Sequence, residues 1–119
     1  MAATFFSTQN DFRKWLKKNH QEERELTVGF YKVGSGKPSI TWPQSVDEAL
    51  CFGWIDGVRQ SIDEYSYQIR FTQRKPGSIW STININKIEA LTKKGLMQPA
   101  GLAAFEKRKD SPGHAKKKK

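Results

Sequence analysis

The segment RFTQRKPGSIWS, residues 70–81, gathers the side chains of this sequence that are best suited to binding an anion. Three cations precede its Pro-Gly turn, and hydroxyl and indole groups lead on into an expected helix: Arg70, Arg74, Lys75, Ser78, Trp80 and Ser81. A helix start presents unsatisfied backbone N–H groups that attract anions, and guanidinium groups bind phosphate and carboxylate oxygens. The segment therefore favours a pocket for phosphate or carboxylate. The alternative is that the cations cover a solvated strand end and that Ser81 only caps the helix.

A second candidate is Asp56, the only acid in the apolar stretch ALCFGWIDG, residues 49–57. A carboxylate buried beside Trp54 would cost free energy unless a cation or backbone donors satisfied it. Because the preceding helix leads directly into the basic hairpin, we expect Arg70 or Arg74 to be that partner. Two alternatives stay open, namely a hydrogen bond to nearby backbone that pins a turn, and a catalytic acid or base.

The other residues offer little material for catalysis or metal binding. Cys51 is the only cysteine, so it has no disulfide partner, and within its apolar run it is typical of a buried hydrophobe. The two histidines, His20 and His114, are too few to form a zinc site with one cysteine, and neither is placed to act with Asp56. We therefore expect no metal, no cofactor and no catalysed reaction. A small-molecule enzyme that uses Asp56 or Tyr31 is the alternative.

The net charge of +9 is concentrated at the C-terminal end of the chain. From residue 106 onward seven Lys and Arg stand against two acids, which gives +5, and the preceding residues, with fourteen against ten, give +4. Residues 110–119, with their Ser-Pro-Gly and lysine run, predict a disordered basic tail. Such a tail can hold phosphates non-specifically, and the alternative is a solvated terminus without a partner.

Four tryptophans close to basic residues support a different interpretation. Trp15 lies on the apolar face of an expected helix and is predicted to be core, whereas Trp42, Trp54 and Trp80 each lie beside a turn. Aromatic rings interleaved with cations suit single-stranded nucleic acid, because its bases stack on such rings. A nucleic-acid-binding protein that uses the basic tail and exposed tryptophans is therefore an alternative function.

Hydrophobic periodicity and capping residues predict the elements that position these side chains. Thr8 and Asp11 indicate the start of a first helix, and Ser45 with Glu48 forms a capping box for a second, which Gly53 ends. The expected helices span 8–20, 44–52, a segment between Ser81 and Gly95, and a last segment from Pro99; the expected strands span 26–33, 58–62 and 65–71.

The strand pattern also predicts where the candidate site residues lie. Alternation over residues 65–72 places Arg70 on the face opposite the apolar side chains, and Asp56 falls in a turn just after the second helix. Residues 1–109 are therefore expected to form a single α+β domain. Its small antiparallel β-sheet, a strand plus a hairpin, should pack with about four helices.

The N-terminal sequence MAATFFSTQND has neither the basic nor the apolar region of a secretory signal. No apolar run approaches the roughly 20 residues that span a bilayer. We therefore expect a cytoplasmic protein without membrane association. Its expected partner is an anionic small molecule or an acidic partner, with nucleic acid as the alternative, and the sequence leaves the oligomeric state open.

Five segments of the chain resemble the bacterial YdeI/OmpD-associated proteins, also called bacteriocin-protection proteins: FYKVGSGKPSITW, SVDEALCFGWIDG, RFTQRKPGSIWS, NINKIEALTKKGLM and PAGLAAFE. The resemblance extends from about Phe5 to Lys107 and is most specific in ALCFGWIDG and in the RKPGS segment. It implies a small α+β fold without an established reaction or cofactor, and a link to resistance against antibacterial agents.

Similar proteins continue into a C-terminal helical segment rich in Arg and Lys, where this chain has SPGHAKKKK. The family's motif residues in this chain are Trp54, Asp56, Gly57, Arg70, Phe71, Arg74, Lys75, Ser78, Trp80 and Ser81. They overlap the anion site inferred above, and the resemblance therefore implies that this cluster is functional.

Overall fold

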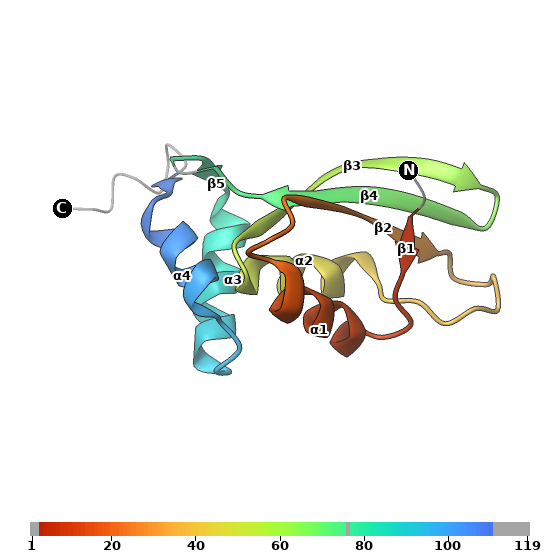
Figure 1. Cartoon of the computed structure of the whole chain (residues 1–119), viewed down its shortest axis with the longest axis horizontal. Coiled ribbons are helices and arrows are strands. Elements are labelled where there is room, and N and C mark those ends of the chain that lie inside the picture. Colours follow the sequence, from red (N-terminus) through yellow and green to blue (C-terminus); the bar gives the residue numbers. More distant parts are fainter. Residues whose placement is uncertain (1–2, 76, 111–119) are drawn as a thin grey trace.

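A four-stranded sheet with helices beneath it makes up most of the molecule (Figure 1). The computed structural model describes residues 3–75 and 77–110. The strands β1 (Thr4–Phe5), β2 (Glu25–Tyr31), β3 (Trp54–Asp63) and β4 (Ser66–Gln73) lie in the order β1-β2-β4-β3. β1 is parallel to β2, and the other neighbouring strands are antiparallel. The helices α1 (Gln9–Asn19) and α2 (Trp42–Cys51) lie under this sheet, so the predicted α+β class is confirmed.

The other helices, α3 (Thr82–Lys93) and α4 (Pro99–Glu106), form the opposite end of the molecule from the β3–β4 turn. A two-residue parallel pair, β5 (Ile79–Trp80) and β6 (Lys109–Asp110), lies beside them. The start of α3 after Ser81 and its stop at Gly95, where φ is +74°, were both predicted by the sequence. Ser81 caps α3, because its Oγ accepts a hydrogen bond from the Asn84 backbone N–H at 3.1 Å.

The face of the sheet that meets the helices is the apolar one. Val28 on β2 pairs with Ile69 on β4, and Leu26 pairs with Phe71, so these side chains share one face. Phe12 of α1 packs edge-on against Phe71 with ring centroids 5.5 Å apart. Arg70 lies on the opposite face and is exposed, as the alternation predicted. An antiparallel sheet with one face in the core and one face in solvent explains this pattern.

The start of α2 differs from the prediction. The helix begins at Trp42 and not at residue 44, and its capping box is formed by Thr41 with Gln44. Ser45 is fully buried inside the helix, and Glu48 pairs with Arg13 of α1. Thr41-x-x-Gln44 meets the same rule as the predicted Ser45-x-x-Glu48 box, and Pro43 in the first turn favours the earlier start.

The end of α2 was predicted correctly, but the segment after it was not. Gly53 ends the helix with φ at +79°, and β3 begins at once with Trp54, so Asp56 lies in a strand and not in a turn. Trp54 and Ile55 pair with β4 residues, which extends the predicted hairpin by four residues towards α2. Within the predicted strand 58–62, Arg59, Gln60 and Ser61 pair with β4, whereas Val58 and Ile62 fall at irregularities of the register. β2 ends at Tyr31, two residues earlier than predicted.

Close helix packing brings α4 against the end of α2. The Gln98 backbone N–H donates to the Cys51 carbonyl at 3.0 Å, and a Cβ on Gly101 would lie 2.2 Å from that carbonyl oxygen. Only glycine allows this approach, so Gly101 fixes how near α4 lies to the end of α2.

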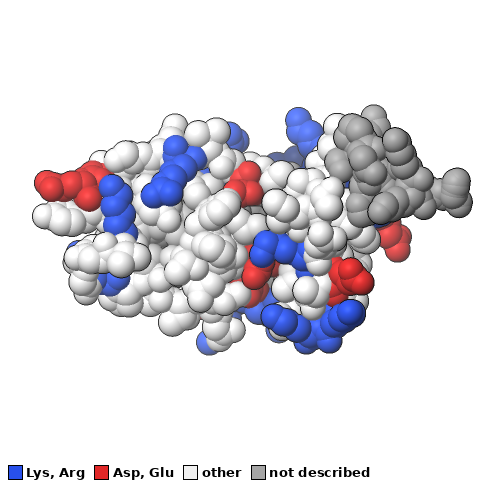
Figure 2. All heavy atoms as spheres, turned by 180° about the vertical axis from the view of Figure 1, so that it is seen from behind, with Lys and Arg blue, Asp and Glu red and all other residues white. Residues whose placement is uncertain are grey.

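Lys and Arg side chains occur in separate groups along the face that Figure 2 shows, with acidic side chains between them. No helix in residues 3–75 and 77–110 has the length and apolar character needed to cross a membrane. The predicted tail begins at Asp110, whose backbone belongs to β6, and the remainder of that tail, residues 111–119, lies outside the described residues.

Candidate functional site

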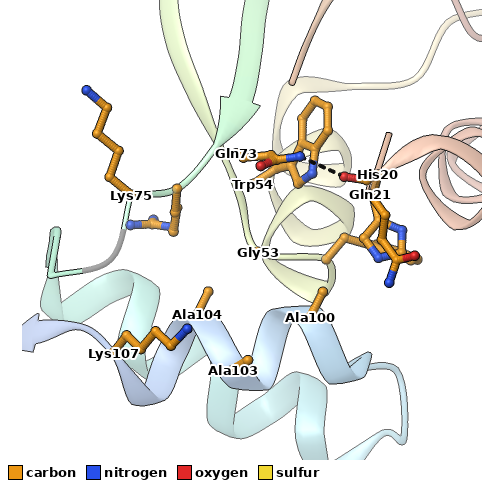
Figure 3. A pocket seen from close by; sticks show the side chains of 12 residues that line it. His20, Gln21, Gly53, Trp54, Gln73, Lys75, Ala100, Ala103, Ala104 and Lys107 are labelled. Carbon is orange, nitrogen blue, oxygen red and sulfur yellow. Dashed lines mark hydrogen bonds between the residues drawn. The ribbon is translucent and has the colours of Figure 1, made fainter. Parts of the chain in front are cut away.

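A cavity of about 330 Å³ lies where the end of α2, the end of β4 and α4 meet, and we call it the Arg74 pocket (Figure 3). The end of α2 and the start of β3 supply Phe52, Gly53 and Trp54, and the end of β4 supplies Gln73, Arg74 and Lys75. The remaining walls are His20 and Gln21 after α1, and Ala100, Ala103, Ala104 and Lys107 on α4. Among the described residues, no Asp or Glu lines this cavity, so its charged wall is entirely cationic.

Gly53 holds two of these walls together. Its carbonyl accepts a hydrogen bond from the Arg74 backbone N–H at 3.0 Å, which ties the end of β4 to the end of α2. A Cβ at this position would lie 2.9 Å from the Ala100 carbonyl oxygen of α4, and the positive φ of Gly53 also favours glycine. Gly53, the helix stop that the sequence predicts, is therefore also the residue at which α2, β4 and α4 come together around the pocket.

The guanidinium group of Arg74 has few partners for its degree of burial. Its Nη2 donates to Asn84 Oδ1 at 3.3 Å, and its Cζ lies 3.9 Å from the ring centroid of Trp80. Its Nε and Nη1 are buried and have no hydrogen-bond partner among the residues that the structure describes. Buried donors are normally paired, because an unpaired one loses its hydration without compensation.

The same burial affects the charge of Arg74. Loss of solvent lowers the pKa of Arg74 to about 10, while the carboxylate of Asp56 acts in the opposite direction and raises it. A group with that pKa is still protonated at neutral pH. Arg74 is therefore a poorly solvated cation with two N–H donors that have no acceptor in the described part of the chain, which is the state that an oxyanion would stabilise most.

Three further buried polar atoms near this region have no partner among the described residues. They are Trp54 Nε1, Trp80 Nε1 and Ser78 Oγ. Trp54 lines the pocket and is only 1% exposed, so its indole N–H adds a donor to those of Arg74. An excess of unpaired donors without unpaired carboxylates suits a ligand that only accepts hydrogen bonds.

The pocket contains three of the eight residues that the sequence analysis proposed: Trp54, Arg74 and Lys75. Trp80 lies outside the pocket with the guanidinium of Arg74 over its ring, and the Ser81 hydroxyl accepts a hydrogen bond as the cap of α3. Lys75 extends away from α4 in Figure 3, whereas Lys107 extends along α4 towards Ala104. The predicted site residues that line the cavity are thus those at the end of the second helix and at the end of the hairpin.

Asp56 and Arg70 lie outside this pocket, and the expected pairing of Asp56 with an arginine is wrong. Asp56 Oδ2 accepts a hydrogen bond from Trp42 Nε1 at 3.0 Å, and Arg70 pairs with Glu25. The register explains the difference, because Asp56 pairs with Phe71 and shares its core-facing side, whereas Arg70 points to the outer face. Asp56 still acts on Arg74 through its charge, although no ion pair joins them among the described residues.

Burial also corrects the expectation that three tryptophans could stack nucleobases. Trp54 and Trp80 are 1% and 0% exposed, so neither ring is accessible, whereas Trp42 is 48% exposed. Trp15 packs against the core and meets Trp54 edge-on, with ring centroids 5.8 Å apart. Cys51 is buried as predicted, and burial is the main reason that the pKa of its thiol is raised.

Sequence reasoning missed the α4 side of the pocket and the contact of Arg74 with Asn84. The signal for α4 was present in PAGLAAFE, because Ala100, Gly101 and Ala104 are small residues on one side of a helix and permit close packing. No local pattern could have indicated that Lys107 would line the same cavity as Arg74. No three His, Cys, Asp or Glu side chains within residues 3–75 and 77–110 come together as a metal site.

Comparison with known proteins gives a family and no function. Neither a curated protein nor a solved structure matches the chain with significant similarity. A family model does match, over residues 4–104, which include the sheet, α1 to α3 and most of α4. The chain therefore belongs to the family described as a domain of unknown function (DUF8412).

Proposed function

We propose that this protein is a non-catalytic binding module for an oxyanion, namely a small molecule or acidic partner that presents a phosphate or carboxylate group to the Arg74 pocket. The observation that supports this most directly is the half-buried Arg74 guanidinium, whose Nε and Nη1 donors have no partner, and whose cavity has no lining carboxylate, among the residues that the structure describes. A bound oxyanion would supply the missing acceptors and offset the lost hydration of the cation.

The shape and polarity of the pocket agree with a small group and not with an extended chain. The floor consists of Ala100, Ala103 and Ala104, which leave room without adding polar groups. Lys107 and the indole N–H of Trp54 provide a second charge and a further donor. A cavity of about 330 Å³ lies at the lower end of the range that small-molecule sites occupy.

The resemblance to the YdeI/OmpD-associated proteins adds to this proposal a role in resistance to antibacterial agents. It also supports the choice of Trp54, Arg74 and Lys75 as binding residues, because they belong to the segments that the resemblance marks. Cytoplasmic location is a part of the same proposal.

The test is a titration with inorganic phosphate, followed by NMR of the Trp54 indole N–H and the Arg74 Nε–H. We expect saturable shifts of both resonances and an affinity at least about tenfold lower in an Arg74→Met variant, because charged hydrogen bonds contribute about 1.5–3 kcal/mol. Arg70→Met is the matched control, since it removes the same charge from the outer face of the sheet and should change the affinity less than about twofold.

Two results would overturn the proposal. One is an equal loss of phosphate binding in the Arg70 and Arg74 variants, which would show that only overall charge matters. The other is the absence of any saturable shift at Trp54 and Arg74 in the unaltered chain.

A further inference from the structure

A second concavity lies at the far end of the sheet from the Arg74 pocket. It is a groove of about 770 Å³ between the loop after β2 and the β3–β4 hairpin, and we call it the Trp42 groove. Its cations are Lys32, Lys37 and Arg59, and its aromatic residues are Tyr31, Tyr67 and Trp42. Within the described part of the chain no acid lines it, and its volume is within the range of sites for small ligands and cofactors.

A β-bulge aims Arg59 at this groove. Asp56 pairs with Phe71 and Arg59 pairs with Ile69, so three residues of β3 advance against two of β4. Residues three apart on a regular strand would point to opposite faces, and the bulge at residues 57–58 places Asp56 and Arg59 on the same one. Arg59 then stacks on Tyr67, with its Cζ 3.8 Å from the ring centroid.

Trp42 is the largest exposed aromatic side chain among the described residues, and its ring is held in place. It lies in the first turn of α2, is 48% exposed, and donates its indole N–H to Asp56 at 3.0 Å. Asp56 does not line the groove, and it holds Trp42 from an adjoining cavity of about 190 Å³ that Trp42 and Arg59 also line. Asp56 is thus a positioning residue for an aromatic surface that remains open to solvent.

Aromatic rings beside cations form the combination that single-stranded nucleic acid requires. Its bases stack on exposed aromatic side chains, while Lys and Arg neutralise the phosphates between them. An acidic peptide would pair with the same cations but would make no use of a fixed indole plane. In Figure 2 the end of the molecule with the β3–β4 turn shows several Lys and Arg side chains behind an acidic tip.

We infer that the Trp42 groove binds a nucleobase joined to phosphate, as in single-stranded nucleic acid, with the base stacked on Trp42 and the phosphates held by Lys32, Lys37 and Arg59. The inference is independent of the oxyanion proposal, because the two cavities share no residue. It also gives Asp56 a role that needs neither an arginine partner nor catalysis.

The test measures binding of a fluorescein-labelled decathymidylate to the full chain by fluorescence anisotropy over a series of salt concentrations. Trp42→Leu should weaken binding about tenfold, because one stacked base contributes about 1–3 kcal/mol. Arg59→Met should lower the salt slope by about 0.7, the value for one phosphate contact on a single strand. Both side chains are exposed, so these variants should keep the fold. Arg70→Met is the matched control, because it removes a charge from the outer face of the sheet and should bind the decamer like the unaltered chain.

Asp56 is tested by a pair of variants. Asp56→Asn keeps an oxygen that accepts from the indole N–H and should retain binding within about threefold, whereas Asp56→Leu should lose about as much as Trp42→Leu. The Trp42 indole N–H resonance should stay near its position in the Asn variant and move in the Leu variant. If both variants bind equally well, Asp56 does not position Trp42.

Two competitors decide the source of the ligand chemistry. If thymidine monophosphate displaces the labelled decamer at concentrations near the dissociation constant of the decamer, the site recognises a single nucleotide. If only unlabelled oligonucleotide displaces it, the site recognises a strand. Equal competition by polyglutamate would overturn the inference, because recognition would then rest on charge alone. Binding of the Trp42→Leu variant within about twofold of the unaltered chain, or no binding of the decamer at all, would overturn it as well.

Discussion

Arg13 and Arg74 both have guanidinium groups that are largely shielded from water, but they differ in how many hydrogen-bond partners those groups have. Arg13 donates from Nη1 to Glu48 Oε1 at 2.8 Å and from Nη2 to the Leu96 carbonyl at 2.7 Å. Arg74 has one long hydrogen bond, to Asn84, and two buried N–H groups without a partner in the described part of the chain. The first arrangement joins α1, α2 and the segment before α4, and the second leaves donor capacity unused.

The pKa values of the two side chains express the same contrast. Burial alone would lower the pKa of Arg13, but its hydrogen bonds to Glu48 and Cys51 more than offset burial and raise that pKa. Burial lowers the pKa of Arg74 to about 10, and the charge of Asp56 offsets only part of the effect. A buried charge that is paired and hydrogen-bonded is typical of a structural site. A buried charge whose donors lack acceptors is typical of a ligand-binding site.

The largest effect is expected from breaking the paired site with Arg13→Met. Glu48 is only 5% exposed, and without Arg13 it would keep the hydrogen bond that the Gln9 side chain donates at 2.7 Å. Removing one member of a buried ion pair leaves the other charge uncompensated, so we expect a loss of about 3 kcal/mol in the free energy of unfolding, measured by urea denaturation.

A second substitution separates the ion pair from the packing around it. Adding Glu48→Leu to the Arg13 variant should restore a part of the lost stability, because the stranded carboxylate is removed. A loss below about 1 kcal/mol in the single variant would mean that the two arginine sites do not differ in the way described.

The opposite sign is expected for the unpaired site. Arg74→Met removes a partly desolvated cation and keeps most of the apolar contact with Trp80, so the free energy of unfolding should stay the same or rise by up to about 1 kcal/mol. The same variant is expected to lose phosphate binding. A gain in stability with a loss of binding is characteristic of functional residues, whose local cost the fold otherwise tolerates.

Urea denaturation of Arg74→Met beside Arg70→Met checks this prediction. Arg70 is exposed and paired with Glu25, so its removal should change the free energy of unfolding by less than about 0.5 kcal/mol. If Arg74→Met is destabilised by more than about 1 kcal/mol, its guanidinium is a structural group like that of Arg13.

Local patterns explain which parts of the fold could be predicted from the sequence. The cap at Ser81 and the stop at Gly95 fixed α3, and the alternation around Arg70 fixed the faces of β4, because each depends on neighbouring residues. The start of α2 was missed because two capping-box patterns follow one another there, Thr41-x-x-Gln44 and Ser45-x-x-Glu48, and the helix uses the first.

The polar partners could not be predicted in the same way, because they come from distant parts of the chain. Glu25 and Arg70 are 45 positions apart, and Arg13 and Glu48 are 35 apart. The sequence correctly predicted that Arg74 lies near the end of the second helix. The reason is that β4 runs back along β3, so the end of the hairpin lies beside its start. That the hairpin would leave Asp56 beside Trp42 depended on the bulge at residues 57–58, for which the sequence gives only Gly57 as a hint.

The smallest expected effect is a dependence of stability on pH that comes from Cys51 beside the paired arginine. Burial raises the pKa of this thiol above its ordinary value, while the hydrogen bond from Arg13 acts in the opposite direction without reversing the shift. Above about pH 8.5 the unfolded chain then loses the thiol proton before the folded chain does, so stability falls as pH rises. Relative to a Cys51→Ala variant, the free energy of unfolding should fall by up to about 0.7 kcal/mol per pH unit where the unfolded thiol is half ionised. Urea denaturation of both proteins between about pH 8 and pH 10 measures this difference. If the free energy of unfolding rose with pH instead, Arg13 would be stabilising the thiolate. Its guanidinium would then be able to bind a further anion, as is proposed for Arg74, and the two arginine sites would no longer differ.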